Sequence, residues 1–86
     1  MMEKADELRE RLRAIISEVS EIDEIPDRTP FRDLGIDSMM AMEIVAEVER
    51  TYKLSIPESE LRTLTHFEAV YELVKRKLEE KGQLLA

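Results

Sequence analysis

Residues 35–45 read GIDSMMAMEIV, and this stretch decides how the surrounding chain folds. Gly35 permits a sharp turn, and the pattern that follows predicts a helix that begins at about Ser38 and ends at about Tyr52. Three of the four residues after Ser38 are methionines, whose flexible side chains suit surfaces that adapt to several partners. The stretch therefore raises two questions: which methionines are buried, and what Ser38 does at the start of a helix.

This predicted helix carries two separate apolar stripes. At about 100° per residue, the first stripe covers an arc of about 100° and is the expected core face. It comprises Ala41, Ile44, Val45, Val48 and Tyr52. The second stripe covers about 60° on another side of the helix. It comprises Met39, Met42 and Ala46, and it is bordered by Glu43, Glu47, Glu49 and Arg50. A small bundle buries one stripe of each helix, so we expect the second to be exposed. The alternative places Met39 and Met42 at the margin of the core, beneath the preceding loop.

Helical periodicity dominates the rest of the chain. An apolar stripe predicts a first helix over about residues 3–18, with Leu8, Leu12, Ile15, Ile16 and Val19 on its inner face. A proline in a first-turn position precedes a short predicted helix over about 57–62. Thr65 and Glu68 have the spacing of a capping box, and the last helix follows them until Gly82. Its apolar residues are Phe67, Val70, Tyr71, Val74 and Leu78.

The segment 20–37 joins the first two long helices. It contains two prolines and Gly35, so it cannot be one continuous helix. Apolar residues recur through it and predict a long loop packed on the core: Ile22, Ile25, Phe31, Leu34 and Ile36. No strand pattern occurs anywhere. We therefore expect an all-α fold, a small bundle of three main helices plus one short helix, in a single domain over residues 1–86.

Composition excludes several classes of function. The net charge of −7 argues against nucleic acid as a partner and favours partners with basic surfaces. The chain has no cysteine, and its acidic residues do not match a calcium-binding loop, so we expect no disulfide and no metal site. No apolar run reaches the roughly 18 residues of a membrane span, and the charged N-terminal segment lacks the apolar region of a secretory signal. A cytoplasmic protein is expected.

Ser38 must be weighed against simple alternatives. A serine at a helix start is commonly just an N-cap. A hydrolase nucleophile is disfavoured, because the G-x-S-x-G turn is missing and the single histidine, His66, lies at the start of another helix. The residues around Ser38 decide between an N-cap and a more specific role.

These residues resemble the acyl carrier protein family. Residues 31–57 read FRDLGIDSMMAMEIVAEVERTYKLSIP, and the family signature is Asp-Ser-Leu or Asp-Ser-Met at the start of the second helix, after Leu-Gly-x. TLTHFEAVYELV, residues 63–74, follows in the family order and spacing, so the resemblance covers nearly the whole chain. It implies that Ser38, next to Asp37, is esterified by 4′-phosphopantetheine, which a phosphopantetheinyl transferase takes from coenzyme A. The thiol of that arm would carry acyl groups as thioesters, and the protein itself would not be an enzyme.

A carrier needs a surface for its partners and a place for its cargo. We expect enzymes with basic patches to dock at Met39, Met40, Met42 and Ala46, and the resemblance implies that Glu43, Glu47, Glu49 and Ile56 join this surface. We expect the acyl chain to enter a slot opened between the second helix and the short third helix. This slot would be lined by Phe31, Ile44, Val45, Val48, Leu61, Val70 and Val74. The alternative leaves the chain outside, on the methionine stripe. A monomer is expected.

Two departures from the family pattern bear on the pathway. Typical bacterial fatty-acid carriers have an acidic residue two positions after the serine, whereas this chain has Met40. Arg50 and Lys53 stand where such carriers often have acids. These differences favour a specialised, stand-alone carrier, in a fatty-acid-like or specialised lipid pathway, over the general fatty-acid carrier. The alternatives are a carrier of polyketide or aminoacyl intermediates, or an unmodified helical adaptor.

Overall fold

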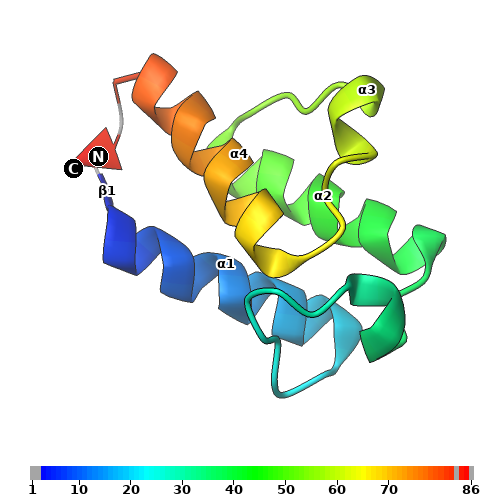
Figure 1. Ribbon diagram of the computed structural model, residues 1–86. Coiled ribbons are helices and arrows are strands. Elements are labelled where there is room, and N and C mark those ends of the chain that lie inside the picture. The colour runs from blue at the N-terminus through cyan, green and yellow to red at the C-terminus, as the bar shows by residue number, and fades with distance from the viewer. Residues whose placement is uncertain (1–2, 83, 86) are drawn as a thin grey trace.

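The computed structural model describes residues 3–82 and 84–85. Its three long helices are α1 (Ala5–Ser20), α2 (Ser38–Tyr52) and α4 (Phe67–Glu80), as Figure 1 shows. A short helix, α3 (Glu58–Leu61), lies between α2 and α4, and a 3-10 helix, η1 (Phe31–Leu34), lies in the long loop after α1. The predicted all-α bundle of three main helices and one short helix is confirmed.

The chain ends differ from the prediction. The first helix begins at Ala5 rather than at residue 3, and Glu3–Lys4 forms a two-residue strand, β1. This strand pairs in parallel with β2, Leu84–Leu85, as the two adjacent ends in Figure 1 show. A strand of two residues is too short to show alternation, and its partner lies at the other end of the sequence. No local pattern could therefore predict this pairing.

The predicted capping box at the start of the last helix is wrong. His66 is the N-cap residue of α4, and no side chain caps it. The Glu68 carboxylate instead accepts two hydrogen bonds from the Arg9 guanidinium of α1, at 2.9 and 3.0 Å. The same guanidinium lies over the Tyr71 ring, 4.1 Å from its centroid. A forked charged pair is stronger than a capping bond, so a tertiary contact decides where Glu68 points.

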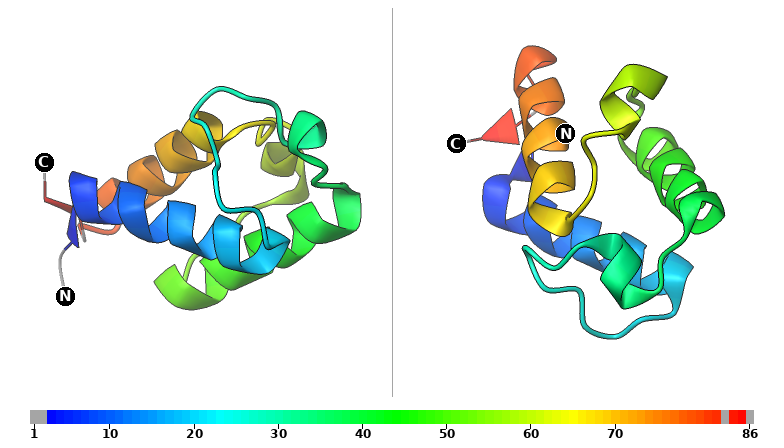
Figure 2. Two further views of the ribbon diagram at one scale, coloured as in Figure 1. Left: turned by 90° about the horizontal axis from the view of Figure 1, so that it is seen from below. Right: turned by 45° about the vertical axis from the view of Figure 1, so that its right-hand side comes forward.

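The core forms where the apolar stripes of the three long helices meet. Helix α1 packs against both α2 and α4, and α3 lies on the side of the molecule away from α1 (Figures 1 and 2). The side chains at the centre are less than 2% exposed: Leu8, Leu12, Ile16, Val48, Phe67, Val74 and Leu78. Helix α3 has no buried residue, so it is the least anchored of the helices.

The long loop is packed on the core, as predicted. Ile25, Phe31 and Ile36 are each less than 10% exposed. The Arg13 guanidinium of α1 donates hydrogen bonds to the Ile25 carbonyl and to the Asp27 carboxylate. The backbone N–H of Phe31 also donates to the Thr65 carbonyl, at 2.8 Å. These bonds hold the loop between α1 and α4, and they place η1 beside the start of α2.

Candidate functional site

The start of α2 presents Ser38 to solvent. Asp37 precedes it as the N-cap residue, and the Asp37 carboxylate accepts a hydrogen bond from the backbone N–H of Met40, at 2.8 Å. Ser38 is the first residue of the helix, and its side chain is exposed. Asp37 rather than Ser38 therefore caps the helix, and the simple N-cap interpretation of Ser38 is wrong.

A turn at Gly35 brings Ser38 to this position. Gly35 has a φ of 86°, which is the left-handed region that favours glycine. Its N–H donates to the Arg32 carbonyl at 3.1 Å, and the N–H of Ile36 donates to the Phe31 carbonyl at 3.0 Å. These bonds close η1 and redirect the chain, so that Ile36 is buried while Asp37 and Ser38 project outward.

An apolar groove opens beside Ser38, between α2, α3 and the start of α4. Its volume is about 260 Å³. Six of the seven predicted slot residues line it: Phe31, Ile44, Val45, Val48, Leu61 and Val70. Val74 does not line it, because it is fully buried in the core. The groove is already open in this structure, whereas a slot that needs α2 and α3 to separate was predicted.

A second hollow lies on the other side of Ser38, toward η1. Its volume is about 460 Å³. It is lined by Pro30, Phe31, Arg32, Ile36, Asp37, Ser38, Ala41, Leu64 and Thr65. More of its lining is polar or charged than in the apolar groove. Phe31, Ser38, Ala41 and Leu64 line both hollows, so the serine stands where they meet.

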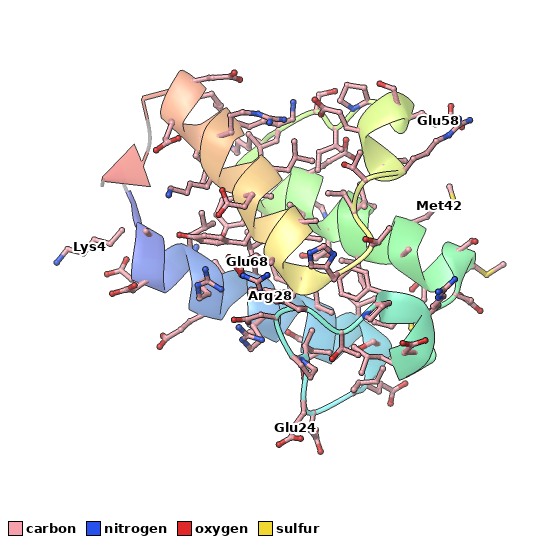
Figure 3. The ribbon with its side chains drawn as sticks, viewed as in Figure 1. Lys4, Glu24, Arg28, Met42, Glu58 and Glu68 are labelled. Atoms are coloured by element: carbon pink, nitrogen blue, oxygen red, sulfur yellow. The ribbon has the colours of Figure 1, made fainter. Side chains whose placement is uncertain are left out.

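The methionine stripe of α2 is exposed. Met39 and Met42 are 73% and 66% exposed, and Ala46 is exposed as well. Figure 3 shows the Met42 side chain directed away from the core, on the same side of the molecule as Glu58. The expectation of an exposed second stripe is confirmed, and the alternative at the core margin is wrong. We call Met39, Met42 and Ala46 the methionine stripe below.

Two residues predicted to belong to the docking surface are less exposed than that prediction requires. Ile56 is only 7% exposed and forms part of the core and of the groove wall. Met40 is half-buried and packs against the core. Ile56 was assigned to this surface by the family resemblance and Met40 by its place in the second helix, and neither source shows which segments cover a residue in this fold.

The three glutamates around the methionine stripe differ in how far their carboxylates are engaged in contacts within the protein. Glu43 is exposed. The Glu47 carboxylate pairs with Arg50 at 2.5 Å, and this hydrogen bond holds the pKa of Glu47 below its ordinary value of 4.5. The Glu49 carboxylate accepts a hydrogen bond from the backbone N–H of Ile56, at 2.8 Å. Of the three, Glu43 is the carboxylate whose charge is least compensated by such contacts.

Four groove residues were given no site role in the sequence analysis: Ala41, Glu58, Arg62 and Leu64. Glu58, Leu61 and Arg62 have the spacing of one helical face, at positions i, i+3 and i+4. That spacing after Pro57 was the available signal. It could not show that this face turns toward α2, because the orientation of so short a helix depends on the contacts at its two ends.

The residues present fit a covalently attached phosphopantetheine. The group needs an accessible hydroxyl, and Ser38 has one at the start of a long helix, where backbone N–H groups favour a phosphate. It also needs space for its arm and cargo, which the neighbouring groove offers. Within residues 3–82 and 84–85, no helix is long and apolar enough to cross a membrane.

Comparison with known proteins identifies the family. Residues 10–76 match the family model described as "Phosphopantetheine attachment site". The chain is 37% identical over 73 residues to the polyketide-8 synthase acyl carrier protein 2 of Streptomyces avermitilis, which covers 81% of this chain and 84% of that protein. It is 43% identical over 60 residues to the anthracycline acyl carrier protein DauA of a Streptomyces species, covering 64% of this chain and 67% of the relative.

The chain also resembles a small part of a much larger protein. It is 38% identical over 72 residues to the non-reducing polyketide synthase dbaI of Emericella nidulans. The match covers 81% of this chain but only 3% of that synthase. The helical fold, the match over residues 10–76 and the relatives agree. The chain thus belongs to the phosphopantetheine-binding acyl carrier proteins, which are non-catalytic carriers that bear 4′-phosphopantetheine covalently.

Proposed function

We propose that this carrier bears its phosphopantetheine arm on Ser38 and carries polyketide intermediates as thioesters. The observation that best supports this attachment site is the position of the Ser38 hydroxyl. It is exposed at the first position of α2, and Asp37 performs the capping that would otherwise engage it. Once esterified, the phosphate would lie beside the free N–H groups and the positive end of the helix dipole.

The attachment site is tested by mass spectrometry. The protein is incubated with coenzyme A and a broad-specificity phosphopantetheinyl transferase, and its intact mass is measured. We expect the wild type to gain one arm and Ser38→Ala to gain none. Ser55→Ala is the matched control, because Ser55 is an exposed serine outside the site, and it should be modified like the wild type. A wild type left unmodified by an active transferase would reject the proposal.

The named relatives support polyketide rather than fatty-acid cargo. The fatty-acid-like pathway was the first expectation from the sequence, with polyketide intermediates as an alternative. The Streptomyces avermitilis carrier and the fungal synthase are named for polyketide synthesis, and the other carrier is named for anthracyclines. The half-buried Met40, in place of the usual acid, fits a carrier that general fatty-acid enzymes use poorly.

The pathway is tested by comparing turnover with two enzyme systems. The holo protein is loaded with malonyl groups and offered to a polyketide ketosynthase system and, separately, to a bacterial fatty-acid elongation set. We expect turnover with the first and slow elongation with the second, relative to a general fatty-acid carrier under the same conditions. Efficient elongation by the fatty-acid set alone would favour the fatty-acid alternative.

We further propose that the methionine stripe and Glu43 form the docking surface. The exposed methionines can adapt to different apolar patches, and Glu43 can attract basic side chains. The transferase and the enzymes that load or elongate the cargo would dock here. Met40, Glu47, Glu49 and Ile56 have smaller parts in this surface than the sequence suggested, since each is partly buried, paired or bonded within the carrier.

A further inference from the structure

Ser38 stands between two hollows, and one arginine lines each of them. Arg62 lines the apolar groove together with Ser38. Arg32 lines the second hollow together with the same serine. Within the described part of the chain, no other lysine or arginine lines either hollow.

We propose that Arg62 is a positioning residue that attracts the phosphodiester of the arm and directs the arm into the apolar groove, while Arg32 competes from the opposite side. This inference rests on the proposed attachment at Ser38. A phosphodiester carries one negative charge at every physiological pH, and a guanidinium can bind it through two parallel hydrogen bonds. The side on which the phosphodiester is held determines which hollow the arm enters first.

The order of the chain places Arg62 at the Ser38 end of the groove. Ile56 is tied to Glu49, near the end of α2. Leu64 lines both hollows and therefore lies beside Ser38, where they meet. The segment 56–64 must then run back along α2 toward the serine, and Arg62 comes two residues before its end.

The ion pairs of the two arginines favour the Arg62 side. Each hollow has one carboxylate in its lining, Glu58 in the apolar groove and Asp37 in the second hollow, so the carboxylates of the linings do not decide between them. Arg32 already lies 3.9 Å from the Asp33 carboxylate. Arg62, in contrast, forms no ion pair with any carboxylate in the described part of the chain, so its guanidinium is available to a new anion.

The hollow that the arm enters determines how well its thioester is protected. Glu58, Ser38 and Arg62 are the polar members of a lining that is otherwise apolar. An arm directed into the groove would shelter its thioester from water and from small nucleophiles. An arm directed toward Arg32 would leave the thioester more accessible. Because both guanidiniums are exposed, the difference should be modest, about two- to fourfold.

The test measures how well the thioester is sheltered. Wild type, Arg62→Gln, Arg62→Lys and Arg32→Gln are each loaded with a hexanoyl group from hexanoyl-coenzyme A, and cleavage by hydroxylamine is followed by intact mass. Free hexanoyl-pantetheine gives the unsheltered rate. We expect Arg62→Gln to be cleaved about two- to fourfold faster than wild type at low salt. Arg62→Lys should lie between the two, and Arg32→Gln should be unchanged or slower. High salt should bring the wild-type rate to that of Arg62→Gln.

A second measurement needs no cargo. The side-chain Nε–Hε signal of Arg62, assigned by its loss in Arg62→Lys, should shift when coenzyme A and the transferase convert the apo protein to the holo form. Equal thermal midpoints of the variants would show that folding is unaffected. The inference is overturned if Arg62→Gln and wild type are cleaved equally, if both Gln variants are cleaved faster, or if the wild-type rate equals that of the free thioester. A protein that accepts no arm would instead overturn the proposed function.

Discussion

The Glu49 carboxylate accepts a hydrogen bond from the backbone N–H of Ile56, at 2.8 Å, and so ties α2 to the segment that leads into α3. This bond connects two residues seven positions apart and turns the chain back along the helix that it has just left. Ile56 is thereby buried against the groove, and α3 is held opposite α2. Glu49 thus helps to position the groove wall at α3, which has no buried residue of its own and is also held to α4 by ion pairs of Glu60 with Lys77 and Arg76, at 3.1 and 3.7 Å.

Glu49→Ala should therefore loosen this wall. We expect a loss of about 1–2 kcal/mol in the free energy of unfolding, because the N–H of Ile56 loses a charged acceptor. Urea unfolding gives the free energy, and hydrogen exchange of the Ile56 amide reports the local opening. Glu43→Ala is the matched control, since it removes an exposed glutamate of the same helix. Equal protection of the Ile56 amide in both variants would contradict the role assigned to Glu49.

At the start of α2, substitutions of the adjacent residues Asp37 and Ser38 should lower the free energy of unfolding by different amounts. Asp37→Ala removes the N-cap and should lower the free energy of unfolding by about 1 kcal/mol. Ser38→Ala should change it by less than about 0.5 kcal/mol, because Ser38 is exposed and does not cap the helix. Asp37→Asn keeps a capping acceptor and should lie close to wild type. Chemical unfolding of the apo proteins checks the order, and a larger cost for Ser38→Ala than for Asp37→Ala would refute it.

The Arg9–Glu68 pair predicts a pH dependence of stability. The hydrogen bond from Arg9 holds the pKa of Glu68 below its ordinary value of 4.5. A carboxyl with a lowered pKa in the folded state contributes stability above about pH 4.5, and loses it as the pH falls through the folded-state value. Glu68→Gln should therefore destabilise the protein at neutral pH and flatten its loss of stability in acid. Thermal midpoints between pH 7 and 3 test this.

The control for that experiment is Glu72→Gln. Glu72 is an exposed residue one turn further along α4, and its substitution should leave the midpoint nearly unchanged at neutral pH. If Glu68→Gln and Glu72→Gln behave alike across the whole range, the ion pair to Arg9 does not stabilise the contact between α1 and α4.

The groove predicts a dependence on the length of the cargo. Each methylene buried in the groove should contribute up to about 0.8 kcal/mol, so the thermal midpoint should rise with acyl length until the 260 Å³ are filled. Amide shifts should follow at Val45, Val48 and Leu61. Leu61→Asp, which places a charge on the groove wall, should remove the rise. A flat midpoint with shifts at Met39 and Ala46, and none at Val45, Val48 and Leu61, would place the chain on the methionine stripe instead; Met42 does not distinguish the two, because it also lines the groove.

We expect Met40→Asp to lower the stability of the protein, which the position of Met40 in the sequence alone does not suggest. If Met40 were an exposed docking residue, Met40→Asp would simply add charge and improve contacts with basic enzymes. Because Met40 is half-buried against the core, we expect the variant to lose stability as well. Ala46→Glu adds the same charge on the exposed stripe and should leave the unfolding midpoint unchanged. Urea unfolding distinguishes the two, and equal midpoints would show that Met40 tolerates a charge.

Much of this protein follows from local sequence. The apolar periodicity of α1, α2 and α4 sets the class of fold, because each helix must bury its own stripe. The two stripes of α2 were also separable from spacing alone, and the structure exposes the methionine stripe as expected. Ser38 stood out because the surrounding residues match a family pattern that the comparisons bear out.

Only the tertiary structure decided which segments cover which side chains. The burial of Ile56 and Met40, the use of Glu49 inside the carrier, and the pairing of Glu68 with Arg9 all depend on residues distant in sequence or on loops. The same holds for the groove, whose walls come from η1, α2, the segment around α3 and α4. Local periodicity reflects how one helix divides its faces between water and core. The partners of each face are set by packing and charge pairing between segments, which a spacing pattern within one helix does not contain.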